Sequence, residues 1–474
     1  MKKTLYILCC GMALFFCGTP GALAQNAGNT ARSLGQRFKD AVTSTYNDAV
    51  SAIKGESNRS NNSRSSTPRV TTTPVSGTCF YVNAASGSNR NAGTSVDAPF
   101  KNIQKAIDAA SDGATILVAE GNYFGTLRSG NINIDKPVTI LGGYNADFTH
   151  RDVLTYRTTV CPSAESNETQ SGKGTMQIKV RRPGTKVTVN GLFFDRGNSI
   201  AYNPDGEGKV DGVESARMQP FGTAGKGGED FKEDVLTAQT AEIFLDNAQC
   251  DIEIRNCAFI NAPDCAIRGT INGQATLSNN VFVGIRKSAV EIAGSNFTRN
   301  SEILFLHNTV LFVWPADLEE NELGYAYRFM NGVDSHLDHN ILGCCWAAAL
   351  DRCRVETLKE KEANKVTTAE YNIFFRNGLG DIALPGGDRP ILVRVQDFDD
   401  VEQLSKVAGN QPVDDPELFD GVIDEAYLDG FETSETMYMN RYPFEQAIAL
   451  FGAVEEYGAQ PILPEEIIRK GKKK

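Results

Sequence analysis

The 474-residue chain lacks three features that would direct its interpretation early: an excess of positive charge, a zinc-type cysteine spacing, and a long apolar run beyond its first residues. Its formal net charge of −12 argues against nucleic acid as a partner and disfavours acidic polysaccharides unless a groove is locally basic. No two cysteines stand in a CxxC pair, which makes a zinc site unlikely to be encoded here. No stretch after residue 24 is long and apolar enough for a membrane span.

The first 24 residues have the composition of an export signal. Lys2 and Lys3 precede an apolar run over residues 5–16, and Ala-Leu-Ala at residues 22–24 forms a small-residue cleavage site. Cys17 leaves lipoprotein processing as an alternative, although phenylalanine stands before it where that site requires a small residue. We therefore expect an exported, soluble mature protein in the periplasm, at the cell surface or outside the cell.

Eight cysteines remain after the signal, and an oxidising compartment permits disulfides among them. The sequence leaves two alternatives open, because small buried thiols are as ordinary as bridged ones. The eight are Cys79, Cys161, Cys250, Cys257, Cys265, Cys344, Cys345 and Cys353.

Composition divides the mature chain into further parts. Residues 25–76 combine one amphipathic helix with a linker rich in Ser, Asn and Thr that has too little apolar area to fold. Residues 77–396 carry the strand patterns, and residues 397–474 are expected to form a mixed C-terminal cap that ends in the basic tail RKGKKK. The helical apolar positions in the first part are Leu34, Phe38, Val42, Ala49 and Ile53.

The strand region opens with a short helix that is predicted to cap a sheet. CFYVN, ATILVAEGNY and KPVTILGGY read as strands followed by turn signals. Between the first two, PFKNIQKAIDAA places apolar residues on one helical face, which suits a cap over an exposed sheet end. These apolar positions are Phe100, Ile103, Ala106, Ile107 and Ala110.

A local pattern then repeats at variable spacing, which indicates stacked coils with loops of different length. The reference column is Gly191, Asn256, Asn279, Asn308, His339 and Tyr371. Two positions earlier stand Val189, Ile254, Leu277, Leu306, Leu337 and Ala369; three positions later stand Phe194, Phe259, Phe282, Leu311, Leu342 and Phe374. Both flanking columns are apolar, so the fold class is all-β, a parallel β-solenoid. The asparagines of the reference column predict an amide ladder at a bend, interrupted by His339 and Tyr371.

A second strand in each coil predicts an inward apolar column and two outward columns. The inward column is Ile267, Val290, Tyr327, Leu350 and Ile382; the outward ones are Ala266, Ala289, Ala326, Ala349, Asp381 and Arg268, Glu291, Arg328, Asp351, Ala383. The alternating charges admit three interpretations. They form a self-compensating ion ladder; or Arg268, Glu291, Arg328 and Asp351 form a ligand-binding face beside flat alanines; or an arginine serves in catalysis, for which Arg268, Arg328 and Arg352 are the candidates. Arginine is a poor base because of its high pKa.

The longest insertion contains a possible calcium loop. NPDGEGKVDGVE, residues 203–214, places oxygen-bearing side chains at the positions that ligate calcium in such loops and glycine at the sharp turn. A solvated acidic loop is the competing interpretation. The candidate ligands are Asn203, Asp205, Glu207, Asp211 and Glu214, and calcium is the one cofactor that the sequence suggests.

The segments YVNAASGSNRNAGTSVDAPFKNIQKAIDAA and GATILVAEGNY resemble the opening of secreted bacterial right-handed parallel β-helix proteins of the pectin-lyase-like superfamily. The later QPVDDPELFD resembles the segment that closes many of these helices. The resemblance covers about residues 79–419. It implies a right-handed parallel β-helix (solenoid) with an N-terminal capping helix, three strands per coil, and export; many relatives act on or bind polysaccharide.

Departures from the family's catalytic patterns leave the function open. The coils show no aspartate cluster of the pectate lyase kind, and no histidine is followed by glycine as in polygalacturonases. Asp399-Asp400 and Asp414-Asp415 lie beyond the coils. Three hypotheses remain: an exported protein that binds polysaccharide or a cell-surface component without catalysis, a lyase acting on uronic-acid-containing glycan, and a structural adhesin-like shaft. The oligomeric state does not follow from the sequence.

Overall fold

A computed structural model describes the chain over ranges that all belong to the second of two compact units, residues 1–71 and 72–474. The predicted signal peptide, the helix and linker of residues 25–76, the calcium loop and the basic tail lie outside the described residues. The described ranges are 78–125, 131–161, 175–195, 241–262, 264–295, 301–315, 324–353, 366–386, 389–434 and 439–466.

Within these ranges the strands form three sheets, named A, B and C, whose main strands pair in parallel. Sheet A comprises β1 (Cys79–Val82), β2 (Ala114–Ala119), β5 (Val138–Tyr144), β6 (His150–Arg151), β9 (Lys186–Asn190), β12 (Asp251–Arg255), β15 (Gln274–Ser278), β18 (Ser301–Leu306), β21 (Val333–Asp338), β24 (Thr367–Glu370), β28 (Lys406–Ala408) and β30 (Glu465–Glu466). Sheet B comprises β3 (Gly121–Phe124), β7 (Thr158–Cys161), β10 (Phe193–Asp195), β13 (Ala258–Ala262), β16 (Val281–Arg286), β19 (Thr309–Trp314), β22 (Ile341–Gly343), β25 (Ile373–Phe375) and β29 (Gln411–Val413). Sheet C comprises β4 (Ile132–Ile134), β8 (Met176–Ile178), β11 (Ile243–Ala248), β14 (Cys265–Ile271), β17 (Ser288–Gly294), β20 (Tyr325–Arg328), β23 (Ala348–Asp351), β26 (Gly380–Leu384) and β27 (Ile391–Val393).

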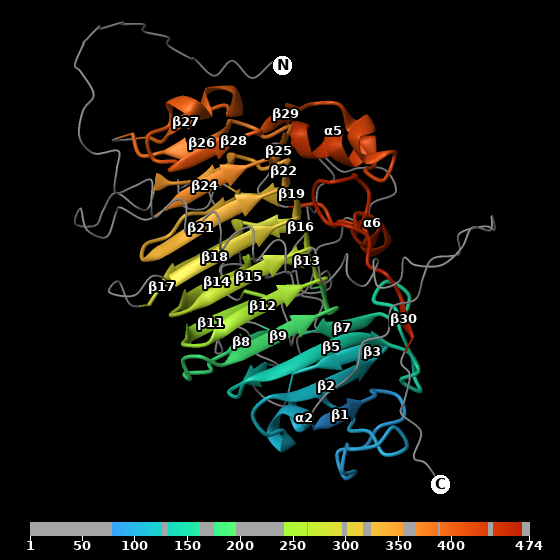
Figure 1. The fold of residues 1–474 in the computed structure, drawn as a ribbon. Helices are drawn as coiled ribbons and strands as arrows, with labels where there is room; N and C mark the ends of the chain where they lie inside the picture. Colours follow the sequence, from blue (N-terminus) through green and yellow to red (C-terminus); the bar gives the residue numbers. More distant parts are fainter. Residues whose placement is uncertain are drawn as a thin grey trace, which may run out of the picture. The chain divides into compact units, whose positions relative to one another are not determined.

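Successive strands of the chain enter different sheets, and each strand pairs with the equivalent strand of the next coil. This connectivity is a parallel β-helix, so the predicted fold class is confirmed. Figure 1 shows the coils stacked from β1 at one end to β28 at the other, with sheet A turned toward the viewer. β28 and β29 lie in the segment expected to form the cap, and they extend sheets A and B by a further strand.

The predicted helix is α2 (Ile103–Ala109), and it covers the first coil. Its apolar positions Phe100, Ile103, Ala106, Ile107 and Ala110 are all buried in the main core. The helix contacts β1, β2 and β4, so its apolar face closes the interior at the end of the stack that the described strands form.

The reference column marks a turn in which each coil passes from sheet A to sheet B through left-handed backbone. The residues are Gly191 (φ 75°), Asn256 (53°), Asn279 (56°), His307 (50°), His339 (52°), Tyr371 (52°) and Gly409 (64°). Glycine and asparagine adopt this conformation most readily, which explains why they recur here. The prediction that Asn308 belongs to the column is wrong by one residue, because Leu306 pairs with Ser278 and Asp338 and thereby places His307 in the turn.

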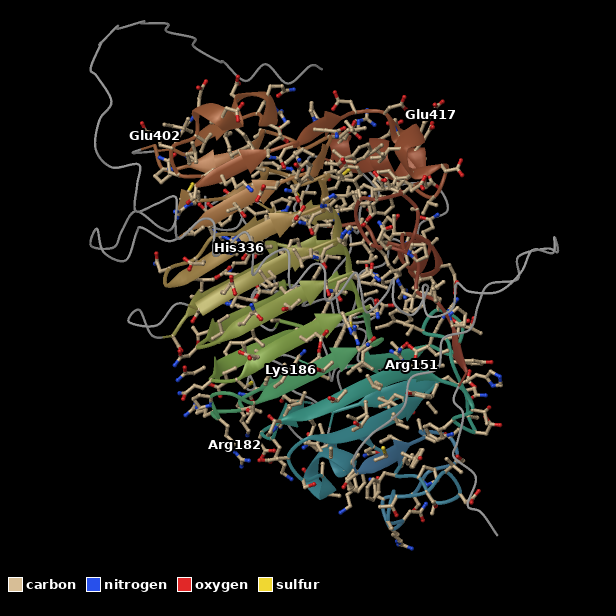
Figure 2. The ribbon with its side chains drawn as sticks, in the orientation of Figure 1. Arg151, Arg182, Lys186, His336, Glu402 and Glu417 are labelled. Atoms are coloured by element: carbon tan, nitrogen blue, oxygen red, sulfur yellow. The ribbon has the colours of Figure 1, made fainter. Side chains whose placement is uncertain are left out.

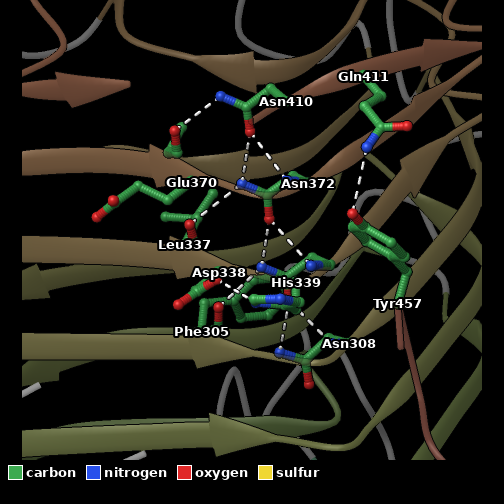
Figure 3. Close-up of polar contacts among 12 residues, drawn as sticks. Phe305, Asn308, Leu337, Asp338, His339, Glu370, Asn372, Asn410, Gln411 and Tyr457 are labelled. Carbon is green, nitrogen blue, oxygen red and sulfur yellow. Dashed lines mark hydrogen bonds and ion pairs between the residues drawn. The ribbon is translucent and has the colours of Figure 1, made fainter. Parts of the chain in front are cut away.

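The amide ladder exists, but it lies one position later than predicted and is buried. It runs through Asn280, Asn308, Asn340, Asn372 and Asn410. From Asn308 onward, each side-chain oxygen accepts from both the backbone and the side-chain nitrogen of the asparagine in the preceding coil (Figure 3), while that of Asn280 accepts from the backbone nitrogen of Cys257. Each side-chain nitrogen also donates to a backbone carbonyl, for example from Asn340 to Phe305 at 2.8 Å. Asn256 and Asn279, which occupy the turn, form a separate outer step beside this ladder. There the side-chain nitrogen of Asn279 donates to the side-chain oxygen of Asn256 at 2.7 Å.

The same one-residue shift applies to the two predicted apolar columns in the coil of Asn308. Phe305, not Leu306, pairs with Leu277 and Leu337, and Val310, not Leu311, pairs with Phe282 and Leu342. The other members are confirmed and fully or nearly fully buried. Phe194, Phe259 and Phe282 stack with ring centroids 5.0 and 4.8 Å apart, which aligns one aromatic ring per coil along the core.

The segment after Val413 covers the outer face of sheet B. It contains η7 (Pro416–Phe419), α5 (Glu425–Thr433) and α6 (Phe444–Ala449), which follow one another beside the coils in Figure 1. Aromatic pairs join the two layers at ring-centroid distances of 4.7 to 5.7 Å: Trp314–Phe431, Phe375–Phe419 and Phe193–Phe444. Asn261 adds two buried hydrogen bonds, to the backbone nitrogen and oxygen of Tyr442. The C-terminal segment therefore covers sheet B at β10, β13, β19 and β25.

Buried cysteines of the coils carry free thiols rather than disulfides. Cys250, Cys257, Cys265, Cys344 and Cys345 are unbridged and at most 1% exposed. Burial raises the pKa of Cys250 to about 12 and that of Cys257 to about 11. These thiols therefore behave as small apolar core residues, one of the two alternatives that the sequence leaves open.

Candidate functional site

The charged column of sheet C lies in the predicted register. Arg268 pairs with Glu291, Glu291 with Arg328, and Arg328 with Asp351, while the inward neighbours pair in the same order and are buried. Arg328 contacts Asp351 at 2.7 Å and Glu291 at 3.4 Å, and Arg268 contacts Glu291 at 3.9 Å. The coil of Arg268 also contributes Asp264, whose carboxylate lies 3.2 Å from the Arg268 guanidinium. The arrangement is a continuous ladder of alternating charges.

Most of this ladder is buried. The side chains of Arg328 and Asp351 are 1% and 2% exposed, whereas Arg268 keeps 24%. Burial alone would lower the pKa of Arg328, but the carboxylates of Asp351 and Glu291 outweigh it and raise the pKa. Arg352 is also buried, with its guanidinium 5.8 Å from the ring centroid of Phe329. A guanidinium whose pKa is raised cannot act as a base, so this column suits structural charge compensation.

The expected flat alanine strip beside the charges is absent from the surface. Ala266, Ala289, Ala326 and Ala349 are fully buried in the main core. The pairing of sheet C omits this position in successive coils, so the alternation of side chains is interrupted there and the alanines turn inward. Asp381 is buried too, and it accepts from Asn377 and from the backbone nitrogen of Val395.

The candidate calcium ligands lie outside the described residues, so the calcium loop stays a prediction. Among the residues that the structure describes, no group of three or more His, Cys, Asp or Glu side chains is placed to hold a metal ion. In the same part of the chain, no helix has the length and apolar character needed to cross a membrane.

The outer face of sheet A carries rows of polar side chains that the sequence patterns do not identify, and several of them, such as His336 at 6% and Thr368 at 7% exposure, are largely buried. Its side chains alternate with the apolar core columns, and Figure 2 shows Lys186 and His336 on this face. Ion pairs join Lys186 to Glu253 at 2.6 Å and Lys406 to Glu370 at 2.5 Å. The polar residues of this face are Thr188, Glu253, Arg255, Thr276, Ser278, Glu302, Asp334, His336, Asp338, Thr368, Glu370 and Lys406.

An aromatic stack borders this face at the corner with sheet B. His307, His339 and Tyr371, which we call the corner stack, have ring centroids 5.1 and 5.3 Å apart. They stack because left-handed residues of consecutive coils project side by side at the strand spacing of about 4.8 Å. Tyr457 of the C-terminal segment lies 5.6 Å from His339 and accepts a hydrogen bond from Gln411 (Figure 3).

Tyr371 presents its ring to solvent while carboxylates flank the stack. The residue is 45% exposed, and its ring lies over Gly409, where a Cβ atom would stand 2.4 Å from the ring. Asp338 and Glu370 directly precede His339 and Tyr371, and both point onto the outer face of sheet A (Figure 3). The corner therefore combines a flat apolar ring with hydrogen-bond acceptors and the ammonium of Lys406.

Two histidines of the corner stack titrate in opposite directions. A hydrogen bond with Asp338 raises the pKa of His339, whereas burial and the neighbouring His339 lower the pKa of His307 to about 4. At neutral pH His307 is therefore neutral, whereas Asp338 favours the protonated form of His339.

We expect His307 to make the fold sensitive to acid. Because its pKa falls from 6.5 in the unfolded chain to about 4 in the fold, its contribution is present above pH 6.5 and is lost as the pH falls toward 4. Urea unfolding measures the free energy of unfolding at neutral pH and near pH 4. Between these two pH values, His307→Asn should lose about 2 kcal/mol less of this free energy than wild type. Asparagine suits the position because it tolerates left-handed backbone. Equal losses of unfolding free energy in wild type and His307→Asn would contradict the lowered pKa of His307.

A recognisable signal for this site is present in the sequence. The residue before each buried ladder asparagine is aromatic in three consecutive coils, His307, His339 and Tyr371, and a carboxylate precedes it in two. Aligning Asn308 with the turn leaves His307 out of this column, so the series of three aromatic residues does not stand out in the sequence.

Comparison with known proteins gives local matches. A family model described as a protein of unknown function (DUF1565) matches residues 85–189. A lacto-N-biosidase from Bifidobacterium longum subsp. longum is 40% identical over 83 residues, which make up 16% of this chain and 5% of that protein. The chain thus spans a small fraction of the curated relative that it matches.

Solved structures share the architecture at low identity. A pectin methylesterase in complex with a hexasaccharide is 10% identical, with a TM-score of 0.32, and the match covers 71% of this chain and 90% of that one. A lacto-N-biosidase from Eubacterium ramulus is 10% identical, with a TM-score of 0.29 and coverage of 71% and 68%. Scores this low leave the fold assignment to the strand pairing itself.

The strand pairing defines the class: the chain is a parallel β-helix protein. Within it, the part that matches DUF1565 runs from the turn after β1 through α2 to β9.

Proposed function

We propose that this is an exported protein that binds a polysaccharide on the outer face of sheet A, at its corner with sheet B, without cleaving the glycan chain. The observation that carries the proposal is the exposed ring of Tyr371, 45% accessible, on an aromatic stack flanked by Asp338 and Glu370. The local similarity to a lacto-N-biosidase is in keeping with a carbohydrate ligand.

The chemistry of the corner suits a sugar ring. Sugars present apolar C–H faces and polar hydroxyl edges, so they pair with a flat aromatic ring beside carboxylate acceptors. Carboxylates accept hydrogen bonds from hydroxyl groups and repel other carboxylates. Together with the net charge of −12, Asp338 and Glu370 favour uncharged glycans over uronic-acid polymers.

The arginine column supports binding rather than chain cleavage by a lyase. A lyase needs a base, and the ion pairs of Arg328 hold its guanidinium protonated. On sheet C, therefore, no described arginine is suited to act as the base that a lyase requires. Arg268 is the more exposed of these arginines, with 24% of its side chain accessible.

Replacing Tyr371 by alanine should weaken glycan binding about tenfold, equivalent to about 1.4 kcal/mol, because the stacking surface is lost. Binding is measured by calorimetry with neutral and uronic-acid oligosaccharides that were first selected on a glycan array. Phe124→Ala is the matched control, since Phe124 is an aromatic residue 52% exposed on β3, in sheet B.

Unchanged affinity in Tyr371→Ala would place the glycan elsewhere. Growth of ultraviolet absorbance from unsaturated products would restore the lyase hypothesis instead. Absence of both binding and cleavage with every glycan would favour the hypothesis of a structural shaft.

A further inference from the structure

Three side chains on the outer face of sheet A are arranged as hydroxyl, imidazole and carboxylate. The Nδ1 atom of His336 lies 3.2 Å from Oγ1 of Thr368, and its Nε2 atom lies 3.5 Å from Oε1 of Glu302. The residues belong to the adjacent strands β24, β21 and β18, and His336 and Thr368 are direct partners in the register. Strand pairing thus places Thr368 directly beside His336, whereas Glu302 pairs with Asp334 and reaches His336 along the diagonal.

The contacts favour one tautomer of the imidazole. A carboxylate accepts only, so the tautomer that suits the relay carries its proton on Nε2, which lies 3.5 Å from Glu302. Nδ1 then keeps a lone pair and accepts from the hydroxyl of Thr368. Burial lowers the pKa of His336, against the carboxylates of Glu302, Asp334 and Glu370 that raise it, so the ring is neutral at neutral pH.

We propose that Thr368, His336 and Glu302 form a nucleophile–base–carboxylate relay that hydrolyses ester substituents, such as acetyl groups, on a bound glycan. A hydroxyl is activated when a base takes its proton and a third group orients that base. The relay itself stands on its own geometry; only the location of the glycan rests on the proposed function.

The reaction proceeds in two balanced steps. The oxygen of Thr368 attacks the ester carbonyl carbon while its proton passes to Nδ1 of His336; the sugar alkoxide then leaves with that proton, and an acyl ester remains on Thr368. Water attacks this ester, gives a proton to His336, and releases the carboxylic acid as the proton returns to Thr368. Lys406, the next residue of the same outward column, is ion-paired with Glu370, and the step requires its ammonium to turn from that carboxylate toward the negative charge that develops on the carbonyl oxygen.

The relay lies beside the corner stack. Thr368 and Glu370 are successive outward residues of β24, roughly 7 Å apart along the strand, and Tyr371 follows directly. A sugar stacked on Tyr371 would thus place substituents of an adjoining ring over Thr368. The substrate class that fits is an uncharged glycan carrying O-acyl groups.

The test uses the full chain with 4-nitrophenyl acetate and, separately, with an acetylated neutral polysaccharide. Wild type should release nitrophenol with turnover, Thr368→Ala should lose at least about 100-fold, and Thr368→Ser should retain activity because it keeps the hydroxyl. Thr276→Ala is the matched control, since Thr276 lies on the same outer face three coils from Thr368 and its replacement should leave the rate unchanged. Mass spectrometry of quenched reactions should locate the acyl group on Thr368.

Equal rates in wild type and Thr368→Ala, or acyl groups only on lysines, would overturn the relay. Unchanged circular dichroism in Thr368→Ala and Thr368→Ser excludes misfolding as the cause of a loss. The two proposals fail separately: nitrophenyl acetate cleavage without glycan binding retains the relay and removes the corner site, and glycan binding without ester cleavage does the reverse.

Discussion

Replacing Asp351 by alanine is expected to destabilise the β-helix by about 3–5 kcal/mol, because the buried guanidinium of Arg328 loses its closest partner. Arg328 is 1% exposed, and its bonds to Asp351 are 2.7 and 2.8 Å long, whereas Glu291 lies at 3.4 Å. A buried charge without its partner carries its full desolvation cost. Urea unfolding followed by circular dichroism measures the loss.

A double variant separates charge from packing. Arg328→Met combined with Asp351→Leu removes both ions and keeps apolar volume, so it should recover most of the lost stability. Loss of the same size in the double variant would show that packing at this position, rather than the unpaired charge, controls stability. Arg182→Ala, an exposed ion pair with Asp112, should change stability by less than about 1 kcal/mol.

Replacing Asn340 by alanine is expected to cost about 3–5 kcal/mol, because one side chain satisfies several buried groups. Its Oδ1 atom accepts from both nitrogens of Asn308, and its Nδ2 atom donates to Phe305 and Asn372 at 2.8 Å each. Alanine leaves these donors and acceptors buried without water. Thermal unfolding compares the variant with wild type.

Asn279→Gly is the matched control for the ladder. Asn279 occupies the left-handed turn, which glycine adopts freely, and its amide contacts Asn256 and Gln460 outside the buried ladder. We expect a change within about 1 kcal/mol. A larger loss in Asn279→Gly than in Asn340→Ala would mean that the outer step, not the buried ladder, holds the coils in register.

Local patterns predicted much of the coil. The apolar face of Phe100, Ile103 and Ile107 predicted the capping helix, and the register from Arg268 through Glu291 to Arg328 followed from counting along each coil. These features succeed because side-chain direction in a helix or strand depends on residues only a few positions away.

The candidate site was not predicted, although His339 and Tyr371 stand in the reference column, because Asn308 took the place of His307 in that column. His339 and Tyr371 looked like interruptions of an asparagine ladder, yet in the structure they stack on each other and on His307. Asparagine is ambiguous here, since it suits both the left-handed turn and the buried position that follows. Only the pairing of Leu306 with Ser278 and Asp338 decides between the two.

The amino-acid order by itself determined that the chain winds into stacked coils, because a strand with one apolar face hides that face only against equivalent strands of neighbouring coils. Tertiary structure alone decided which surfaces stay open. The C-terminal elements η7, α5 and α6 pack against sheet B. The charges around Arg328 are buried and paired with one another. The ring of Tyr371 stays exposed to solvent. Exposure depends on what packs over a residue from far along the chain, and no local pattern contains that information.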